Sequence, residues 1–319
     1  MPSDNIIKPS VSPNPRRGSF RRNSLCLLTA AILLAATFHA QAQTTGTTAS
    51  STPDAAVDSE DFYSIYDYET PKRGWFEPNL WMTYIPETRN GFWHFNTSRP
   101  REGLTAYTTE IEYGVTDHFS VSTYADLMVA HGSENYLAYY GGPHSSGLQF
   151  TQARVEGRYR FAEPRTHFFD MAMYAEYYFP RKSFSTSQEL ETRLILERNF
   201  KDFRLDLNPT LAFSTTGADA SGIPALDFNA GIYYERVPHF QPGIEYYSAY
   251  SALNNVPPTK LQQHLIFPTL TFPLNNFECH VGVGFGLTPH SDQLTLKTIV
   301  SYQFDGKRLA RLFQHSPSN

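Results

Sequence analysis

The chain has 319 residues, of which 18% are charged, and its formal net charge is −5. An acidic chain argues against nucleic acid as a partner, and none is expected. Of the two cysteines, Cys26 lies near the N-terminus and Cys279 is the only one in the rest of the chain, so no disulfide framework is predicted. No Cys/His pairs have zinc spacing, and neither a metal nor a cofactor is predicted.

The first predicted element is a secretory signal peptide over residues 1–42. Four arginines between positions 16 and 22 precede the apolar run LCLLTAAILLAATF, and Ala40-Gln41-Ala42 ends it with small residues. The apolar run is too short for a membrane-spanning helix. Removal of this peptide leaves 21 basic and 30 acidic residues, a net charge of −9. The chain is therefore expected to be exported.

Residues 43–78 are predicted to be a periplasmic N-terminal segment. Residues 43–60 are rich in Thr, Ser and Ala and are expected to be disordered. The acidic and aromatic stretch that follows, up to Pro78, is interpreted as a tether, a short helix or a plug. The sequence does not distinguish among these three.

From Asn79 onward, apolar and polar residues alternate in successive segments of mostly 10–13 residues. Soluble strands commonly have about 5–6 residues, whereas a tilted membrane-spanning strand needs about 9–11. We therefore predict an all-β fold, a transmembrane antiparallel up-and-down β-barrel of about 12 strands over residues 79–304, followed by a periplasmic tail over 305–319. The expected strands are 79–87, 105–114, 118–130, 148–161, 167–179, 188–200, 202–214, 225–236, 239–250, 262–273, 276–287 and 293–304.

The connections between these segments alternate in length. Short ones such as VTD, VP and LNN follow even-numbered strands, and longer ones such as HGSENYLAYYGGPHSSG follow odd-numbered strands. This alternation is expected of a barrel with one periplasmic end and one external end. It is not expected of a soluble sandwich, although a sandwich would show the same alternation of apolar and polar faces.

Aromatic residues favour the membrane barrel over a secreted soluble β-protein. At the short-turn end, every strand but the first places an aromatic residue on its apolar face, and such residues form the girdle at a lipid–water boundary. These residues are Tyr113, Phe119, Phe161, Phe169, Phe200, Phe203, Tyr234, Phe240, Phe272, Phe277 and Phe304.

The hairpin EIEYGVTDHFSVSTYAD resembles one found in uncharacterised Gram-negative outer-membrane barrels described as transporters, some of them placed in phenol-degradation pathways. The stretch ELETRLILERNFKDFRLDLNPTLAF resembles a later hairpin of the same group. The resemblance spans most of residues 79–304 and implies a barrel in the outer membrane of a Gram-negative bacterium. It implies no catalytic residues and no established substrate.

Two short motifs resemble functional sites, but the first is expected to be a structural turn and the second a chance occurrence. Tyr-Gly-Val-Thr-Asp at 113–117 is expected to form a tight turn, with left-handed conformations and side-chain-to-backbone hydrogen bonds. His131 and Ser133 lie on the lipid face at the outer rim and are the basis of a disfavoured alternative, an outer-membrane lipid hydrolase. No Asn on a neighbouring strand is positioned to orient the histidine, so no enzyme is predicted.

Gly282, Gly284 and Gly286 occupy alternate positions of one strand on the lumen face. No helix follows them, so they are not a dinucleotide-binding loop. A stripe without side chains gives room either to neighbouring lumen side chains or to a permeation groove.

The lumen face is rich in charge, and its acids exceed its bases. Such charges must pair or be hydrated, so they form either a structural ion-pair network or a selectivity ladder for a small solute. The candidates for this ladder are Glu110, Glu112, Asp126, Arg154, Glu156, Arg158, Arg160, Asp170, Glu176, Arg193 and Asp227.

These features predict a narrow outer-membrane channel for small solutes with an acid-rich lumen. A closed structural barrel without transport is the main alternative. The expected partners are outer-membrane lipid, the barrel-assembly machinery and a small-molecule solute that the sequence does not identify.

Overall fold

A computed structural model of the chain describes residues 63–86, 101–130, 147–217, 220 and 222–307. The predicted signal peptide, residues 43–62, the tail beyond residue 307, and both His131 and Ser133 lie outside the described residues. Within the described part, no helix is long and apolar enough to cross a membrane.

In the described residues, the fold consists of twelve long strands, a two-residue strand that continues the last of them, and one short 3-10 helix, η2 (Thr259–Leu261). The predicted all-β barrel is confirmed, and the largest difference lies in the first strand, which was expected from Asn79 and begins at Trp75. The strands are β1 (Trp75–Ile85), β2 (Leu104–Gly114), β3 (Phe119–Ala130), β4 (Gln149–Arg160), β5 (Asp170–Pro180), β6 (Glu189–Phe200), β7 (Phe203–Ser214), β8 (Ala225–Tyr234), β9 (Gln241–Ala252), β10 (Gln263–Leu274), β11 (Phe277–Gly286), β12 (Leu294–Tyr302) and β13 (Phe304–Asp305).

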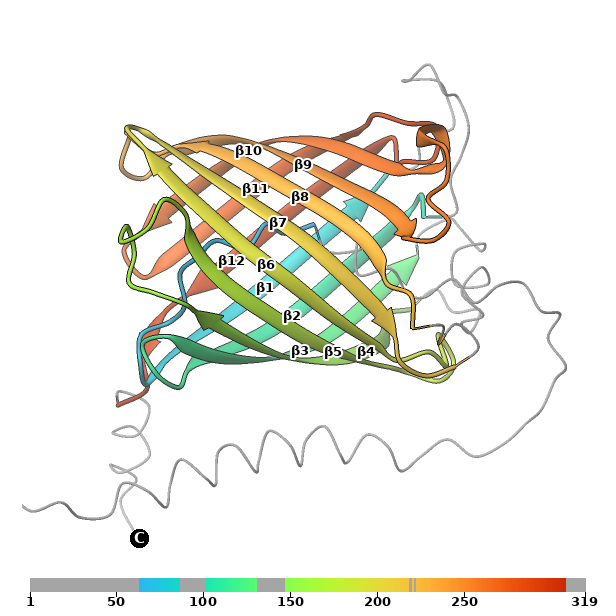
Figure 1. Cartoon of the computed structure of the whole chain (residues 1–319), viewed down its shortest axis with the longest axis horizontal. Helices are drawn as coiled ribbons and strands as arrows, with labels where there is room; N and C mark the ends of the chain where they lie inside the picture. The colour runs from blue at the N-terminus through green and yellow to red at the C-terminus, as the bar shows by residue number, and fades with distance from the viewer. Residues whose placement is uncertain (1–62, 87–100, 131–146, 218–219, 221, 308–319) are drawn as a thin grey trace, which may run out of the picture. The chain divides into compact units, whose positions relative to one another are not determined.

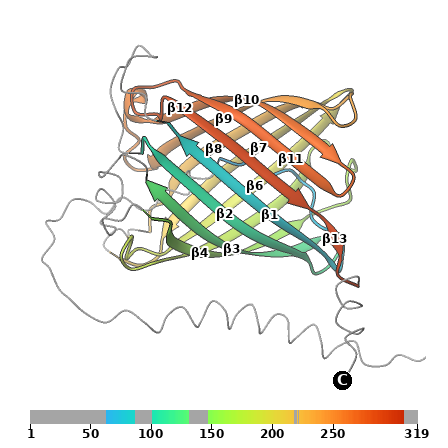
Figure 2. The same cartoon turned by 180° about the vertical axis from the view of Figure 1, so that it is seen from behind.

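Each long strand pairs antiparallel with the next one in the sequence, and β12 returns to pair with β1. The closing register runs from Asn79 opposite Ser301 to Tyr84 opposite Leu296. Figures 1 and 2 show the strands as a tilted ring viewed from opposite sides. Because the ring is closed, the backbone polar groups of its strands pair with neighbouring strands on both sides.

The alternation of side chains places charge inside the ring and apolar groups outside. On β2, Ile111 is 54% exposed, whereas Glu110 and Glu112 on either side of it are each 3% exposed. On β12, Leu296 is exposed and Lys297 is buried. A soluble protein hides its apolar groups, whereas a barrel surrounded by lipid presents them outward. The arrangement here is the second one.

The aromatic residues at the short-turn end continue onto β1, which was expected to lack one. Because β1 begins at Trp75, it presents Phe76 on the apolar face. The Phe76 ring lies 4.7 Å from that of Tyr113 and 5.6 Å from that of Phe304, measured between ring centroids. Phe76 therefore joins the aromatic residues of β2 to that of β13 at the point where the barrel closes.

The turn between β2 and β3 differs from its prediction in one respect. None of residues 114–118 has a positive φ, so no left-handed conformation is needed there. Gly114 is required for a close approach instead, because a Cβ there would overlap the carbonyl groups of Pro71 and Lys72. The expected side-chain-to-backbone hydrogen bonds are present: the Thr116 hydroxyl accepts from the His118 backbone N–H, and Asp117 accepts from the Arg73 backbone N–H.

Candidate functional site

A row of carboxylates crosses the inner wall from β1 to β6. In the strand register, Glu77 lies opposite Glu112, and Glu156 opposite Glu176, which in turn faces Glu191. Ser122 fills the one position between Glu112 and Glu156. Directly opposed side chains on one face lie about 5 Å apart at Cβ, and like charges there repel each other. The row therefore needs cationic or hydrogen-bonding partners.

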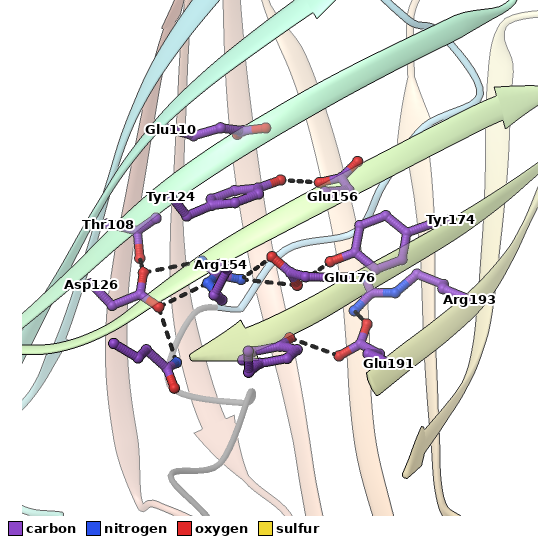
Figure 3. Close-up of polar contacts among 12 residues, drawn as sticks. Thr108, Glu110, Tyr124, Asp126, Arg154, Glu156, Tyr174, Glu176, Glu191 and Arg193 are labelled. Atoms are coloured by element: carbon purple, nitrogen blue, oxygen red, sulfur yellow. Dashed lines mark hydrogen bonds and ion pairs between the residues drawn. The ribbon is translucent and has the colours of Figure 1, made fainter. Parts of the chain in front are cut away.

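Two arginines of β4 supply cationic partners on either side of Glu156. Arg154 Nε lies 2.8 Å from Asp126 Oδ2, and its Nη1 lies 3.0 Å from Glu176 Oε1 (Figure 3). Arg158 Nε lies 3.3 Å from Glu156 Oε1, and its Nη2 lies 3.6 Å from Glu112 Oε2. The positions 154, 156 and 158 share one face because side chains alternate along a strand. Each arginine thus bridges two carboxylates.

Tyrosines complete the hydrogen bonding of the row. Tyr124 donates to Glu156 and Tyr174 donates to Glu176, while the Tyr178 hydroxyl lies 3.0 Å from Glu191 Oε2. The Arg154 guanidinium lies 4.2 Å from the centre of the Tyr124 ring. Sequence reasoning singled out the charged residues only. The tyrosines were detectable as well, because each lies on the same parity as the charges.

The remaining predicted candidates have other partners. Asp170 accepts a hydrogen bond of 2.6 Å from the Arg165 backbone N–H and does not pair with Arg154 or Arg158. Arg160 donates to the Asp117 carbonyl, and Glu110 accepts from Asn79 Nδ2 at 2.9 Å. Arg193 Nη2 lies 2.7 Å from Glu191 Oε1.

A second buried network surrounds Glu245 of β9. Its carboxylate pairs with Lys297, lies 3.1 Å from His280 Nε2, and accepts hydrogen bonds of 2.7 Å from Tyr233 and 2.8 Å from Tyr247. The sequence alone does not relate Glu245 to Lys297, because β9 and β12 are not adjacent in the sheet.

Neighbouring side chains occupy the space beside the glycine stripe of β11. A Cβ on Gly284 would overlap the ring of Phe267, and a Cβ on Gly282 would lie 3.0 Å from both Lys297 Cε and Thr269 Cγ2. The missing side chains thus allow Phe267 and Lys297 to lie against the wall.

The segment before β1, residues 63–70, lies inside the ring of strands (Figures 1 and 2). The Tyr66 backbone N–H donates to Asn208 Oδ1 at 2.7 Å, and its carbonyl accepts from Asn208 Nδ2 at 3.0 Å. The Tyr68 backbone N–H donates to Glu197 Oε2 at 3.0 Å. In the same segment, the charge of Asp67 raises the pKa of Glu69 above its ordinary value.

Tyr63 anchors the beginning of this segment against β9 and β10. Its hydroxyl accepts a hydrogen bond of 2.8 Å from Gln263 Nε2 and donates to Asp292 Oδ2 at 3.2 Å. Its ring lies 5.2 Å from that of Tyr247 and 5.0 Å from that of Phe267, between centroids. The segment is therefore held to the wall by side chains of several strands.

Comparison with known proteins supplies no function for the chain. Residues 93–248 match a family described as "Family of unknown function (DUF6662)". No curated protein matches the sequence. Among solved structures, the KdgM porin has a TM-score of 0.46 at 11% identity, over 72% of this chain and 99% of that chain.

Two further solved structures resemble this chain with comparable TM-scores. The COG4313 outer membrane channel from Pseudomonas putida F1 has a TM-score of 0.49 at 11% identity, over 76% of this chain and 100% of that chain. The outer membrane protein Omp33 of Acinetobacter baumannii has a TM-score of 0.40 at 9% identity, over 75% and 100%. All of these scores are below 0.5, so the description of the fold depends on the strand pairing of this chain itself.

Proposed function

We propose that the protein is a narrow, cation-preferring channel for small solutes in the outer membrane, occluded in this state by residues 63–70. The observation that carries the proposal is the excess of negative charge on the inner wall. Among the described strand residues, ten carboxylates but only three cationic side chains are buried. The acids are Glu110, Glu112, Asp126, Glu156, Asp170, Glu176, Glu191, Glu197, Asp206 and Glu245, and the cations are Arg154, Arg158 and Lys297.

The sign of this excess determines the expected selectivity. Confined charges with low-dielectric walls concentrate ions of opposite sign, so an open lumen with this wall favours cations and disfavours anions. A barrel of twelve strands is intermediate between filled eight-stranded barrels and wide sixteen-stranded porins. The open path is therefore expected to be narrow.

The inserted segment supports a channel over a barrel filled only by its own wall. Residues 63–70 are not part of any strand, and they contact the wall through hydrogen bonds and aromatic rings. If this segment leaves, the groups that remain around the lumen include carboxylates and hydroxyls that water solvates well. A plug of this kind is removable without breaking the strand pairing.

The outward-facing apolar side chains and the aromatic girdle support location in the outer membrane. Contact with outer-membrane lipid and insertion by the barrel-assembly machinery belong to the same proposal. We also propose that the chain belongs to the group of outer-membrane barrels with the E-x-E-Y-G hairpin. The support for this is the motif at residues 110–117.

One observation favours the alternative of a closed structural barrel: the arginines of β4 each bridge two carboxylates across the wall. Single-channel conductance in planar bilayers separates the two functions. Deletion of residues 43–70 removes the plug and retains Lys72 and Gly74, which bond to the start of β1 and to the β2–β3 turn. We expect larger conductance steps in this variant than in the full chain. Absence of conductance in both would favour the closed barrel.

A further inference from the structure

A small cavity lies between the inserted segment and the wall formed by β6, β8, β9 and β10. Its volume is about 30 Å³, and Ser64 of the segment forms part of its lining. Such a volume holds roughly two water molecules. Its wall side includes Arg193 of β6, Asp227 of β8 and Gln263 of β10. The cavity is thus polar and brings a cation and an anion to the same space.

Arg193 is the donor side of this cavity. Its side chain is 10% exposed, and one of its nitrogens, Nη2, bonds to Glu191. Among the residues that the structure describes, Nε and Nη1 have no hydrogen-bond partner. The rings of Tyr66 and Tyr174 hold the guanidinium at 4.6 and 5.2 Å from their centroids. A guanidinium that is largely shielded from water and has unused N–H groups is costly unless an acceptor, best a carboxylate, bonds to it.

Asp227 is the acceptor side. In the strand register, Arg193 lies opposite Thr210, which lies opposite Asp227, so all three share the inner face. Two strand spacings separate the backbones of Arg193 and Asp227 by roughly 10 Å, and both side chains extend to the same cavity. A carboxylate at this place attracts an ammonium group and repels an anion.

We propose that this cavity is a binding site for a small zwitterionic solute of the amino-acid type. The solute carboxylate bonds to Arg193, and its ammonium group faces Asp227. A simple anion is opposed by Asp227, and a simple cation is opposed by Arg193, so the site selects a molecule with both charges. This proposal rests on the proposed channel function, since the solute is taken to bind on its path through the lumen.

The size of the cavity restricts the solute to the smallest members of the class. Glycine has five heavy atoms and is the smallest amino acid, but it needs more space than the roughly two water molecules that the present cavity holds. The lining residue Ser64 lies on the inserted segment, so a small shift of that segment enlarges the cavity without changing the wall. Larger amino acids are expected to bind only when the segment has left.

The test compares glycine, acetate and methylamine by isothermal titration calorimetry on the full-length protein in detergent. Glycine should bind saturably, and acetate and methylamine at least tenfold more weakly. Asp227→Asn removes the repulsion toward anions, so acetate should gain affinity while glycine loses it. The matched control is Asp202→Asn in the β6–β7 turn, which should behave as the natural chain does.

Equal binding of acetate and glycine by the natural chain would overturn the proposal, as would no binding of glycine at all. An unchanged preference in Asp227→Asn would also overturn it. The gain for acetate is a readout that misfolding cannot produce. Calorimetry needs no conductance, so bound glycine with no conductance would refute only the channel, and conductance without glycine binding would refute only the site.

Discussion

Asn208 holds the backbone of Tyr66 on both sides: its Oδ1 accepts from the Tyr66 N–H at 2.7 Å, and its Nδ2 donates to the Tyr66 carbonyl at 3.0 Å. One carboxamide thereby makes the two bonds that a neighbouring strand would otherwise make. Asn208 is fully buried on the inner face of β7. This side chain therefore fixes the inserted segment to the wall at one specific residue.

Asn208→Ala should destabilise the occluded state. It removes two hydrogen bonds and leaves both Tyr66 backbone groups without their partner, which costs about 2 kcal/mol and shifts the closed-to-open ratio roughly thirtyfold. Single-channel recording in planar bilayers measures the open fraction. Asn255→Ala, in the exposed connection between β9 and β10, serves as the matched control and should leave the open fraction unchanged. An equal open fraction in both variants would show that residues 63–70 do not gate the lumen.

Val283→Arg tests which face meets lipid. Val283 is 38% exposed on the outer face of β11, near the middle of the strand. An arginine at the bilayer midplane costs about 2–4 kcal/mol, whereas one near the interface costs about 0–1 kcal/mol. Unfolding by urea from lipid vesicles should show this difference against the control Val237→Arg, which lies in the exposed β8–β9 turn. Similar free energies of unfolding for the two variants would favour a protein surrounded by water.

The strand pattern could be predicted from the sequence because alternation is a local property. The start of β1 was missed because Pro78 lacks a backbone N–H and the acidic, aromatic run before it does not alternate clearly. The position of residues 63–70 inside the ring could not be predicted. It depends on contacts such as Tyr66 with Asn208, which are far apart in the sequence and have no local periodicity.

For the candidate site, the sequence predicts which side chains face the lumen but not which of them pair. The parity of Glu112, Arg154 and Glu176 places them inside, but parity does not say which arginine meets which acid. That depends on register between strands, and register places Glu156 opposite Glu176 while Asp170 lies nearer the turn. Long side chains then reach diagonally, as Arg154 does toward Asp126. Pairing is thus a property of the assembled sheet.

The pair of Lys297 and Glu245 should behave as a buried ion pair. Both side chains are almost wholly buried. Lys297→Met leaves Glu245 without its nearest cation and should lower the free energy of unfolding by about 3–5 kcal/mol. The double variant Lys297→Met/Glu245→Gln removes both charges and should recover most of that loss. Urea unfolding of the natural chain, of Lys297→Met, of Glu245→Gln and of the double variant measures the interaction as a double-mutant cycle. Additive losses would mean that the two side chains do not interact.

The last prediction concerns ion selectivity and uses the pairing of the row. Glu110→Gln, Glu112→Gln and Glu176→Gln together remove three negative charges from the inner wall. The fold should survive, because Arg154 keeps Asp126 as a partner and Arg158 keeps Glu156.

In the variant lacking residues 43–70, these three substitutions should lower the preference for cations, since the remaining wall attracts cations less strongly. The reversal potential in a salt gradient measures this preference and should move toward zero or change sign. Glu163→Gln with Asp202→Asn removes charges from exposed turns and should leave the reversal potential where it was. If the triple variant also leaves it unchanged, the carboxylates of β2 and β5 do not line the path of the ions, and the row is a structural network alone.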